Sequence, residues 1–283
     1  MKEFAKWILK HIGIYHPLQS FYRNIINFSR NKFYQLAYFK LKGKGFTCNF
    51  CAVKYQKFVP EYPSKKIAEA LDKYKVIAGY GTNVFCPNCL SKNRERLLRA
   101  VFDDTLSIEN KLILHFSPEK HLHQYLKKKA TVTTVDLLPE FYRSIDKSID
   151  FSDATHLKFE NETFDVVVAN HILEHIPEDL KAIKEINRVL KNRGFAILQV
   201  PYSENLKTTI EEPFINNPEL QERLYGQKDH VRIYSLENYL ERLRKGGFQP
   251  KVLTPYLLKQ YAKYAIQEKE CVIIAYKQFE KTT

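Results

Sequence analysis

The sequence predicts an α/β protein whose mostly parallel β-sheet follows a cysteine-rich segment and basic N-terminal helices. From residue 111 onward, short apolar runs alternate with amphipathic segments, which is typical of a parallel sheet covered by helices. Two closely spaced cysteine pairs precede this region. Residues 1–66 carry 13 Lys and Arg against two Asp and Glu, whereas the remainder carries 32 against 30. We therefore expect three parts, over residues 1–45, 46–104 and 105–283.

The composition is that of a globular protein. Of the 283 residues, 44% are hydrophobic and 27% are charged, which is sufficient for a sizeable core. No run approaches the roughly 18 apolar residues of a membrane-spanning helix. Lys2, Lys6 and Lys10 interrupt any apolar stretch of a signal peptide. We therefore expect a cytoplasmic protein, with peripheral attachment to the inner face of the membrane through its basic N-terminal part.

Residues 1–45 interleave Lys and Arg with aromatic residues at loosely helical spacing, which predicts one or two amphipathic helices. The aromatic residues are Phe4, Trp7, Tyr15, Phe21, Tyr22, Phe28, Phe33, Tyr34, Tyr38 and Phe39. Such helices suit the headgroup region of an anionic membrane. The same side chains would suit single-stranded RNA, and a helix packed on the body is a third alternative. Of these we favour the membrane over nucleic acid.

The two cysteine pairs predict a structural zinc site. Cys48 and Cys51 form one knuckle, Cys86 and Cys89 the other, and four thiolates favour tetrahedral zinc. The 34 residues between the pairs exceed the usual spacing of about 15 to 20, which predicts an insertion. The alternative is two unrelated surface pairs or a redox dithiol. Cys271 lies in an apolar run and is expected to be buried.

The order of elements follows from the hydrophobic pattern. A helix is expected over residues 94–102. In the α/β part, strands are expected over 111–116, 131–135, 148–151, 164–169 and 195–200, and helices over 121–129, 178–189 and 236–245. A turn is expected at Gly194, and residues 248–253 and 271–276 are expected to pair as an antiparallel ribbon.

Polar residues stand at the predicted carboxyl ends of the parallel strands, where ligands of open α/β sheets bind. An acid after the second strand, Asp136, is suited to binding a ribose diol. The full set along four strands is Ser117, Pro118, Glu119, Asp136, Asp153, Ala154, Asn170 and His171.

Residues 164–201, FDVVVANHILEHIPEDLKAIKEINRVLKNRGFAILQVP, resemble the region of strands four and five in class I S-adenosylmethionine-dependent methyltransferases of the type 11-like kind. CPNCLSKNRERLL (86–98), LILHFSPE (112–119), HILEHI (171–176) and YGQKDHVRIY (225–234) are similar to a bacterial subgroup in which a zinc knuckle precedes the catalytic domain. The resemblance implies a Rossmann-like seven-stranded sheet, S-adenosylmethionine as cofactor, and methyl transfer.

The resemblance also implies roles for the strand-end residues. Glu119 would face the amino-acid end of the cofactor, and Pro118 would shape the turn before it. Asp136 would bind the ribose hydroxyls, and Asp153 the adenine amino group with Ala154 beside it. Ser117, Asn170 and His171 complete the predicted cofactor contacts. The chain departs from the family at the loop HFSPEK, which lacks the usual glycines.

Methyl transfer requires mainly positioning and desolvation, and a hydroxyl acceptor also requires a base. His171 and His175 are four residues apart and share a face on a helical turn, with Glu174 near enough to orient one of them. Alternatively, Glu174 and His175 hold the loop to the neighbouring helix. We expect His171, His175 and His230 as candidate catalytic residues.

Residues 202–234 are expected to form a lid on the acceptor side. His230 and Arg232 would point the same way in an extended stretch, as a base and an anion clamp, and Tyr202 is a further expected acceptor contact beside Glu174. A solvated loop is the alternative. We expect O-methylation of a small-molecule, glycan or lipid-linked acceptor. The alternatives are an RNA or protein methyltransferase, or a non-catalytic cofactor-binding module recruited through the basic segment and the zinc knuckle.

Overall fold

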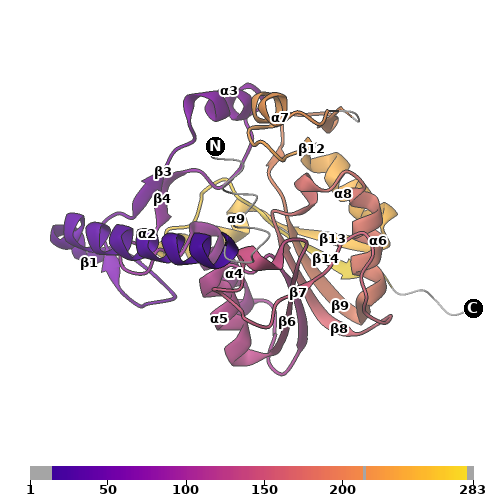
Figure 1. Cartoon of the computed structure of the whole chain (residues 1–283), viewed down its shortest axis with the longest axis horizontal. Coiled ribbons are helices and arrows are strands. Elements are labelled where there is room, and N and C mark those ends of the chain that lie inside the picture. The colour runs from indigo at the N-terminus through magenta and orange to yellow at the C-terminus, as the bar shows by residue number, and fades with distance from the viewer. Residues whose placement is uncertain (1–14, 213–214, 279–283) are drawn as a thin grey trace, which may run out of the picture.

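The structure, a computed structural model, describes residues 15–212 and 215–278 (Figure 1). The helix predicted for the first residues, with Phe4 and Trp7, lies outside the described residues. Within the described ranges, none of the helices is long and apolar enough to span a bilayer.

A seven-stranded sheet forms the centre of the molecule, in the order β13-β14-β9-β8-β5-β6-β7 (Figure 1). Strands β5 to β9 are parallel, while β14 is antiparallel to both of its neighbours. This confirms the predicted mostly parallel sheet and its antiparallel ribbon. The strands are β5 (Leu112–Phe116), β6 (Thr131–Asp136), β7 (Asp150–Phe151), β8 (Phe164–Asn170), β9 (Leu190–Gln199), β13 (Phe248–Leu253) and β14 (Val272–Lys277).

The strand order reverses between β5 and β8. From β5 the chain continues to β6 and β7 on one side of the sheet, and then returns to β8 and β9 on the other. Phe116, the last residue of β5, lies opposite Ala169 of β8 and Val135 of β6. The carboxyl ends of these strands therefore meet at the point where a ligand of such a sheet is expected.

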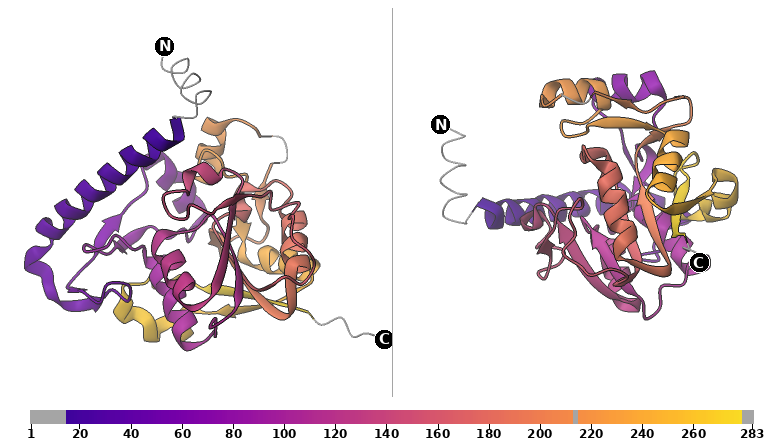
Figure 2. Two further views of the ribbon diagram at one scale, coloured as in Figure 1. Left: turned by 60° about the horizontal axis from the view of Figure 1, so that its bottom comes forward. Right: turned by 90° about the vertical axis from the view of Figure 1, so that its right-hand side faces the viewer.

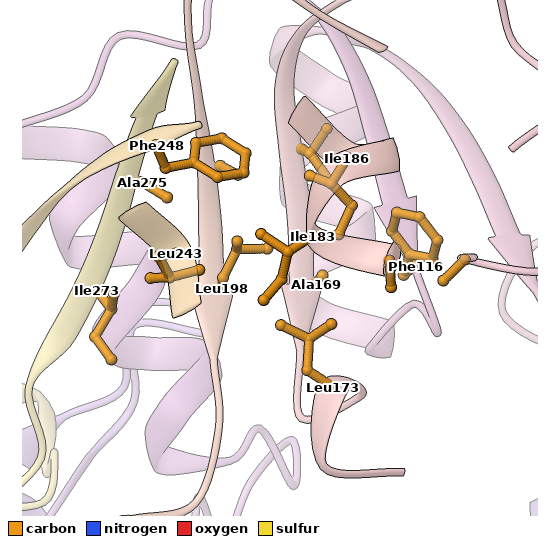
Figure 3. Packing of buried hydrophobic residues seen from close by; sticks show 14 of the residues in the cluster. Phe116, Ala169, Leu173, Ile183, Ile186, Leu198, Leu243, Phe248, Ile273 and Ala275 are labelled. Carbon is orange, nitrogen blue, oxygen red and sulfur yellow. The ribbon is translucent and has the colours of Figure 1, made fainter. Parts of the chain in front are cut away.

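Helices cover both faces of the sheet because its central strands are apolar on both sides. In β8, Val167 and Ala169 pack with helices α6 (Asp179–Val189) and α8 (Leu236–Lys245). Val166 and Val168 face helices α4 (Asn93–Asp104) and α5 (Lys120–Lys129). Figure 3 shows Ile183 and Leu243 of the first pair against the sheet.

The turn predicted at Gly194 is an irregularity inside β9. The strand begins at Leu190, and its register with β8 shifts between Phe164 and Val166. A Cβ atom added to Gly194 would lie 2.9 Å from the carbonyl oxygen of Asp165. Glycine therefore permits the two strands to pass this closely.

The cysteine-rich segment consists of two small hairpins and an inserted helix. Strands β1 (Lys42–Thr47) and β2 (Lys54–Tyr55) pair, as do β3 (Val59–Glu61) and β4 (Gly81–Phe85). Helix α3 (Lys65–Tyr74) lies between β3 and β4 and accounts for the long spacing between the cysteine pairs.

The segment after β9 is folded rather than irregular. Residues 202–234 hold the strands β10 (Tyr202–Ser203), β11 (Ile210–Glu211) and most of β12 (Arg232–Ser235), which form a small sheet. Helix α7 (Pro218–Tyr225) packs against α3, so the two insertions meet at one end of the molecule (Figure 1). The remaining short helices are η1 (Phe39–Leu41), η2 (Pro139–Phe141), η3 (Leu173–His175), α9 (Pro255–Leu258) and η4 (Lys259–Tyr264).

A single long helix, α2 (Tyr15–Ala37), runs along one side of the molecule (Figure 2). Asn31 and Gln35 each donate a hydrogen bond to the carbonyl oxygen of Asn88, which fixes the helix to the cysteine segment. Its outer surface is apolar, with exposed Leu18, Tyr22, Ile25, Ile26, Phe33 and Leu36.

Arg96 joins three separate parts of the chain. Its guanidinium is fully buried and donates to carbonyl oxygens of β4, of the second cysteine knuckle and of η4. The acceptors are Asn83, Val84, Ser91, Tyr264 and Ala265. Burial lowers the pKa of Arg96, and the negative charge of Cys48 and Cys86 opposes this shift.

Candidate functional site

A cavity of about 1210 Å³ lies at the carboxyl ends of β5, β6, β7 and β8. The structure brings the predicted strand-end residues together there: Ser117, Pro118, Glu119, Asp136, Asp153, Ala154, Asn170 and His171 all line it. Helix α2 forms a wall of this cavity with Asn27, Phe28, Arg30 and Asn31. We call this space the main cavity.

The loop after β5 makes its tight turn without glycine. Ser117 has a φ of +45°, in the left-handed region, at a cost of about 1–2 kcal/mol for a residue with a side chain. Its amide donates to the carbonyl oxygen of Val135, and its hydroxyl donates to Oδ2 of Asp136 at 2.6 Å. These hydrogen bonds hold the turn that glycine makes elsewhere in the family that the sequence resembles.

Glu119 is a partly buried carboxylate with two polar partners, Arg94 and Asn170. Nε of Arg94 donates to Oε1 at 2.8 Å, and Nδ2 of Asn170 donates to Oε2 at 2.9 Å. Burial raises the pKa of Glu119, but the charge of Arg94 and the hydrogen bond from Asn170 outweigh it, so the net pKa is lowered. Among the described residues, nothing hydrogen-bonds to the buried Oδ1 of Asn170, which leaves it for a ligand.

Asp136 and Asp153 lie at the ends of β6 and β7. Oδ1 of Asp136 accepts from the amide of Leu138. Oδ1 of Asp153 accepts both hydrogen bonds from Thr155, which lower the pKa of Asp153. Both carboxylates are therefore held in place at the cavity, where their oxygens can accept hydrogen bonds from hydroxyl or amino groups.

A second cavity of about 250 Å³ adjoins the main cavity. The two share the lining residues Lys92, Arg94, His171, His175 and Gln227. We call it the acceptor cavity, because it continues from the main cavity toward the predicted lid.

The predicted histidines and Glu174 meet at the acceptor cavity. Nδ1 of His171 lies 3.4 Å from Oε1 of Glu174, and Nδ1 of His175 lies 3.3 Å from Oδ2 of Asp229. The rings of His175 and His230 are perpendicular, with centroids 4.7 Å apart. His171 has a φ of +53°, so the backbone is also strained where β8 ends.

The environments of these groups differ. Burial lowers the pKa of His230 to about 4. Burial also lowers the pKa of His175, but the hydrogen bond with Asp229 outweighs it and the net pKa is raised. Burial raises the pKa of Glu174, and the neighbouring imidazole of His171 outweighs this effect, so the carboxylate is ionised.

Two predicted residues do not reach the site. Tyr202 is buried, and its hydroxyl accepts from the amide of Cys271 and donates to the carbonyl oxygen of Lys269. Arg232 is buried and its guanidinium donates to Glu211, Leu173, Ile176 and Pro177. Neither is among the described residues that line the two cavities.

Sequence reasoning missed Arg94, Gln227 and Asp229, all of which line the main cavity. Arg94 lies in the motif CPNCLSKNRERLL, so the resemblance could have marked it. Its role depends on helix α4 packing beside the end of β5, which spacing in the sequence does not reveal.

The four cysteines form the predicted cluster. Their sulfur atoms lie within 4.8 Å of one another, with Cys48 to Cys89 at 3.6 Å and Cys51 to Cys86 at 3.7 Å. A zinc ion with bonds of about 2.3 Å places its sulfur ligands roughly 3.8 Å apart, so the cluster fits a closed zinc site. The carbonyl oxygen of Cys89 lies 2.8 Å from Nε2 of His121, which lines the main cavity.

Comparison with known proteins finds similarity in the α/β part of the chain. Residues 118–198 match a family model described as a methyltransferase domain. An uncharacterized protein of Methanocaldococcus jannaschii is 38% identical over 74 residues, which are 26% of this chain. The match spans 31% of the length of that curated relative.

Solved structures share the fold. A chain of the complex between the Haloferax volcanii Trm112 methyltransferase activator and a methyltransferase has a TM-score of 0.50 at 14% identity, covering 66% of this chain and 92% of that chain. A Listeria monocytogenes structure described as an S-adenosylmethionine-dependent methyltransferase has a TM-score of 0.43 at 17% identity, covering 66% and 98%. At 14% identity the Haloferax likeness shows the fold alone.

We expect Cys86→Ser to lower the zinc content by about one equivalent per chain relative to the unchanged protein, because three thiolates no longer close the site. Elemental analysis of protein purified without chelator measures this. Cys271→Ala is the matched control, since Cys271 is buried away from the cluster and should leave the zinc content unchanged. Equal zinc content in the two variants would contradict the assignment.

Proposed function

We propose that this S-adenosylmethionine-dependent methyltransferase methylates a hydroxyl group of a glycan or lipid-linked acceptor at a membrane surface. The observation that carries the proposal is the junction of the two cavities. The strand-end carboxylates gather in the main cavity, and a histidine cluster lines the smaller one beside it.

The residues of the main cavity suit the cofactor in a defined order along the strand ends. Glu119, with Arg94 beside it, would hold the ammonium and carboxylate of the amino-acid end. Asp136 would accept hydrogen bonds from the ribose hydroxyls, and Asp153 from the adenine amino group. The unpartnered Oδ1 of Asn170 supports a polar ligand at this place.

S-adenosylmethionine, when bound, supplies a sulfonium methyl carbon that the acceptor oxygen attacks while the C–S electron pair leaves to sulfur. The chain's own residues must orient the acceptor, exclude water and accept the hydroxyl proton. Of the two histidines that line both cavities, His171 and His175, we assign the last role to His171. His175 is engaged by Asp229, and the lowered pKa of His230 makes it a poor base.

The surface of α2 supports an acceptor at a membrane. Its exposed apolar side chains lie on a helix that also contributes a wall of the main cavity. Lys32 adds an exposed positive charge to this helix. The Haloferax neighbour is found with a protein activator. Because apolar and basic groups share the α2 surface, we propose that this surface contacts an anionic lipid bilayer rather than a protein activator.

We expect Asp136→Asn to weaken S-adenosylmethionine binding at least 10-fold in calorimetric titration, since an amide loses the charge-assisted hydrogen bonds to the ribose. Asp150→Asn is the control, because Asp150 is exposed on neighbouring β7 outside the cavity lining. Absence of binding to the unchanged protein at millimolar cofactor would overturn the assignment of the main cavity.

Labelled S-adenosylmethionine added with the protein to membrane extracts should transfer its methyl group to a lipid or glycan fraction. His171→Ala should reduce this transfer about 100-fold or more, while His156→Ala, at an exposed position outside both cavities, should keep it. Label recovered in RNA or protein instead would refute the acceptor class.

Replacing Phe33 and Leu36 by Ser should weaken binding to vesicles of anionic lipid about 10-fold, because two exposed apolar side chains of α2 no longer enter the bilayer. Co-sedimentation with the vesicles measures the change. Leu257→Ser, which removes an exposed leucine from α9, serves as the control. Unaltered sedimentation of the double variant would show that α2 does not dock on the membrane.

A further inference from the structure

Glu174 is a buried charge without a hydrogen bond. Its side chain is 1% exposed, and within the part of the chain that the structure describes neither carboxylate oxygen has a hydrogen-bond partner. Leaving an ionised carboxylate buried and unpaired is costly, so such a group in a folded protein usually has a counter-ion or a ligand. The nearest imidazole nitrogen, Nδ1 of His171, is 3.4 Å away.

Glu174, His175 and His230 place one potential ligand atom each within 4.8 Å of one another. They come from two places in the chain, since Glu174 and His175 belong to η3 while His230 lies just before β12. The backbone holds these places together, because the amide of Val231 donates to the carbonyl oxygen of Glu174. The convergence is therefore built by the fold and is not the chance proximity of mobile side chains.

Asp229 gives His175 the partner that metal-binding histidines usually have. A ligating imidazole commonly donates its other N–H to a carboxylate, which orients the ring. Here Oδ2 of Asp229 lies 3.3 Å from Nδ1 of His175, which leaves Nε2 for an ion. This pairing is an observation independent of the three converging ligands.

We propose that Glu174, His175 and His230 bind a divalent transition-metal ion, at a site separate from the cysteine cluster. Two imidazoles and one carboxylate are a common ligand set for zinc and non-haem iron when coordination positions stay open. The ion neutralises the buried carboxylate of Glu174 and supplies the partner that its oxygens lack.

The open positions of this ion would face the acceptor cavity, which all three ligands line. This part rests on the proposed function: an acceptor hydroxyl bound to the ion lies beside the main cavity and close to His171. The ion also occupies the two imidazoles of His175 and His230. His171 is then left as the histidine that accepts a proton.

The test uses Co²⁺ as the probe. Protein dialysed with a weak chelator until it retains one zinc per chain is titrated with Co²⁺ and followed by visible absorption. We expect one further equivalent to bind with d–d bands of a nitrogen and oxygen site and no thiolate charge-transfer band. Bound Co²⁺ should also raise the midpoint of thermal unfolding.

Glu174→Gln and His230→Gln should each weaken Co²⁺ binding at least 10-fold and abolish the thermal shift. Glu178→Gln is the matched control, since Glu178 is four residues away with a side chain that is 68% exposed. Near-ultraviolet circular dichroism establishes that each variant is folded, and the two ligand variants serve as a check on each other.

No saturable Co²⁺ binding to the unchanged protein, or equal binding by Glu174→Gln and Glu178→Gln, would overturn the site. A thiolate charge-transfer band would do the same, because the ion would then be in the cysteine cluster. The titration requires neither cofactor nor acceptor. Its failure is therefore distinguishable from a failure of S-adenosylmethionine to bind.

Discussion

The buried guanidinium of Arg96 beside the cysteine cluster is the interaction on which the rest of the arrangement depends. A charge buried this completely is tolerated only when it is hydrogen-bonded and compensated. Carbonyl oxygens from β4, the second knuckle and η4 provide the hydrogen bonds, and four thiolates around a zinc ion would carry the compensating negative charge. Because Arg94 precedes it by two residues on the same helix, fixing Arg96 also fixes the partner of Glu119 in the main cavity.

The cofactor loop shows how one backbone geometry can be reached by different side chains. A glycine adopts a left-handed φ without steric cost, whereas Ser117 adopts it under strain. The hydroxyl of Ser117 bonds to Asp136, so the residue that bears the strain also orients a predicted cofactor contact. The missing glycines therefore do not by themselves indicate an inactive site.

Local patterns predicted much of the fold, and long-range packing accounts for most of what they missed. The bounds of α8 and β13 agree with the prediction, because periodicity and the glycines between them are visible in the sequence. Helices α3 and α7 were not predicted; each lies in an inserted segment and packs against the other. The strand-end residues could be placed from the order of strands. Arg94 could not. The burial of Arg232 could not be foreseen either, because its carbonyl partners lie more than 50 residues away in sequence.

Helix α2 has one side at the main cavity and the other at the surface. Any ligand that shifts this helix by binding at one side therefore changes the binding affinity at the other side. By thermodynamic linkage, the two affinities change by the same factor. If binding of the outer side to a membrane raises the affinity for the cofactor by some factor, then the cofactor-bound protein must bind the membrane more tightly by that same factor. On the proposed function, the enzyme would therefore bind the membrane that holds its acceptor more tightly while it carries a methyl group to give.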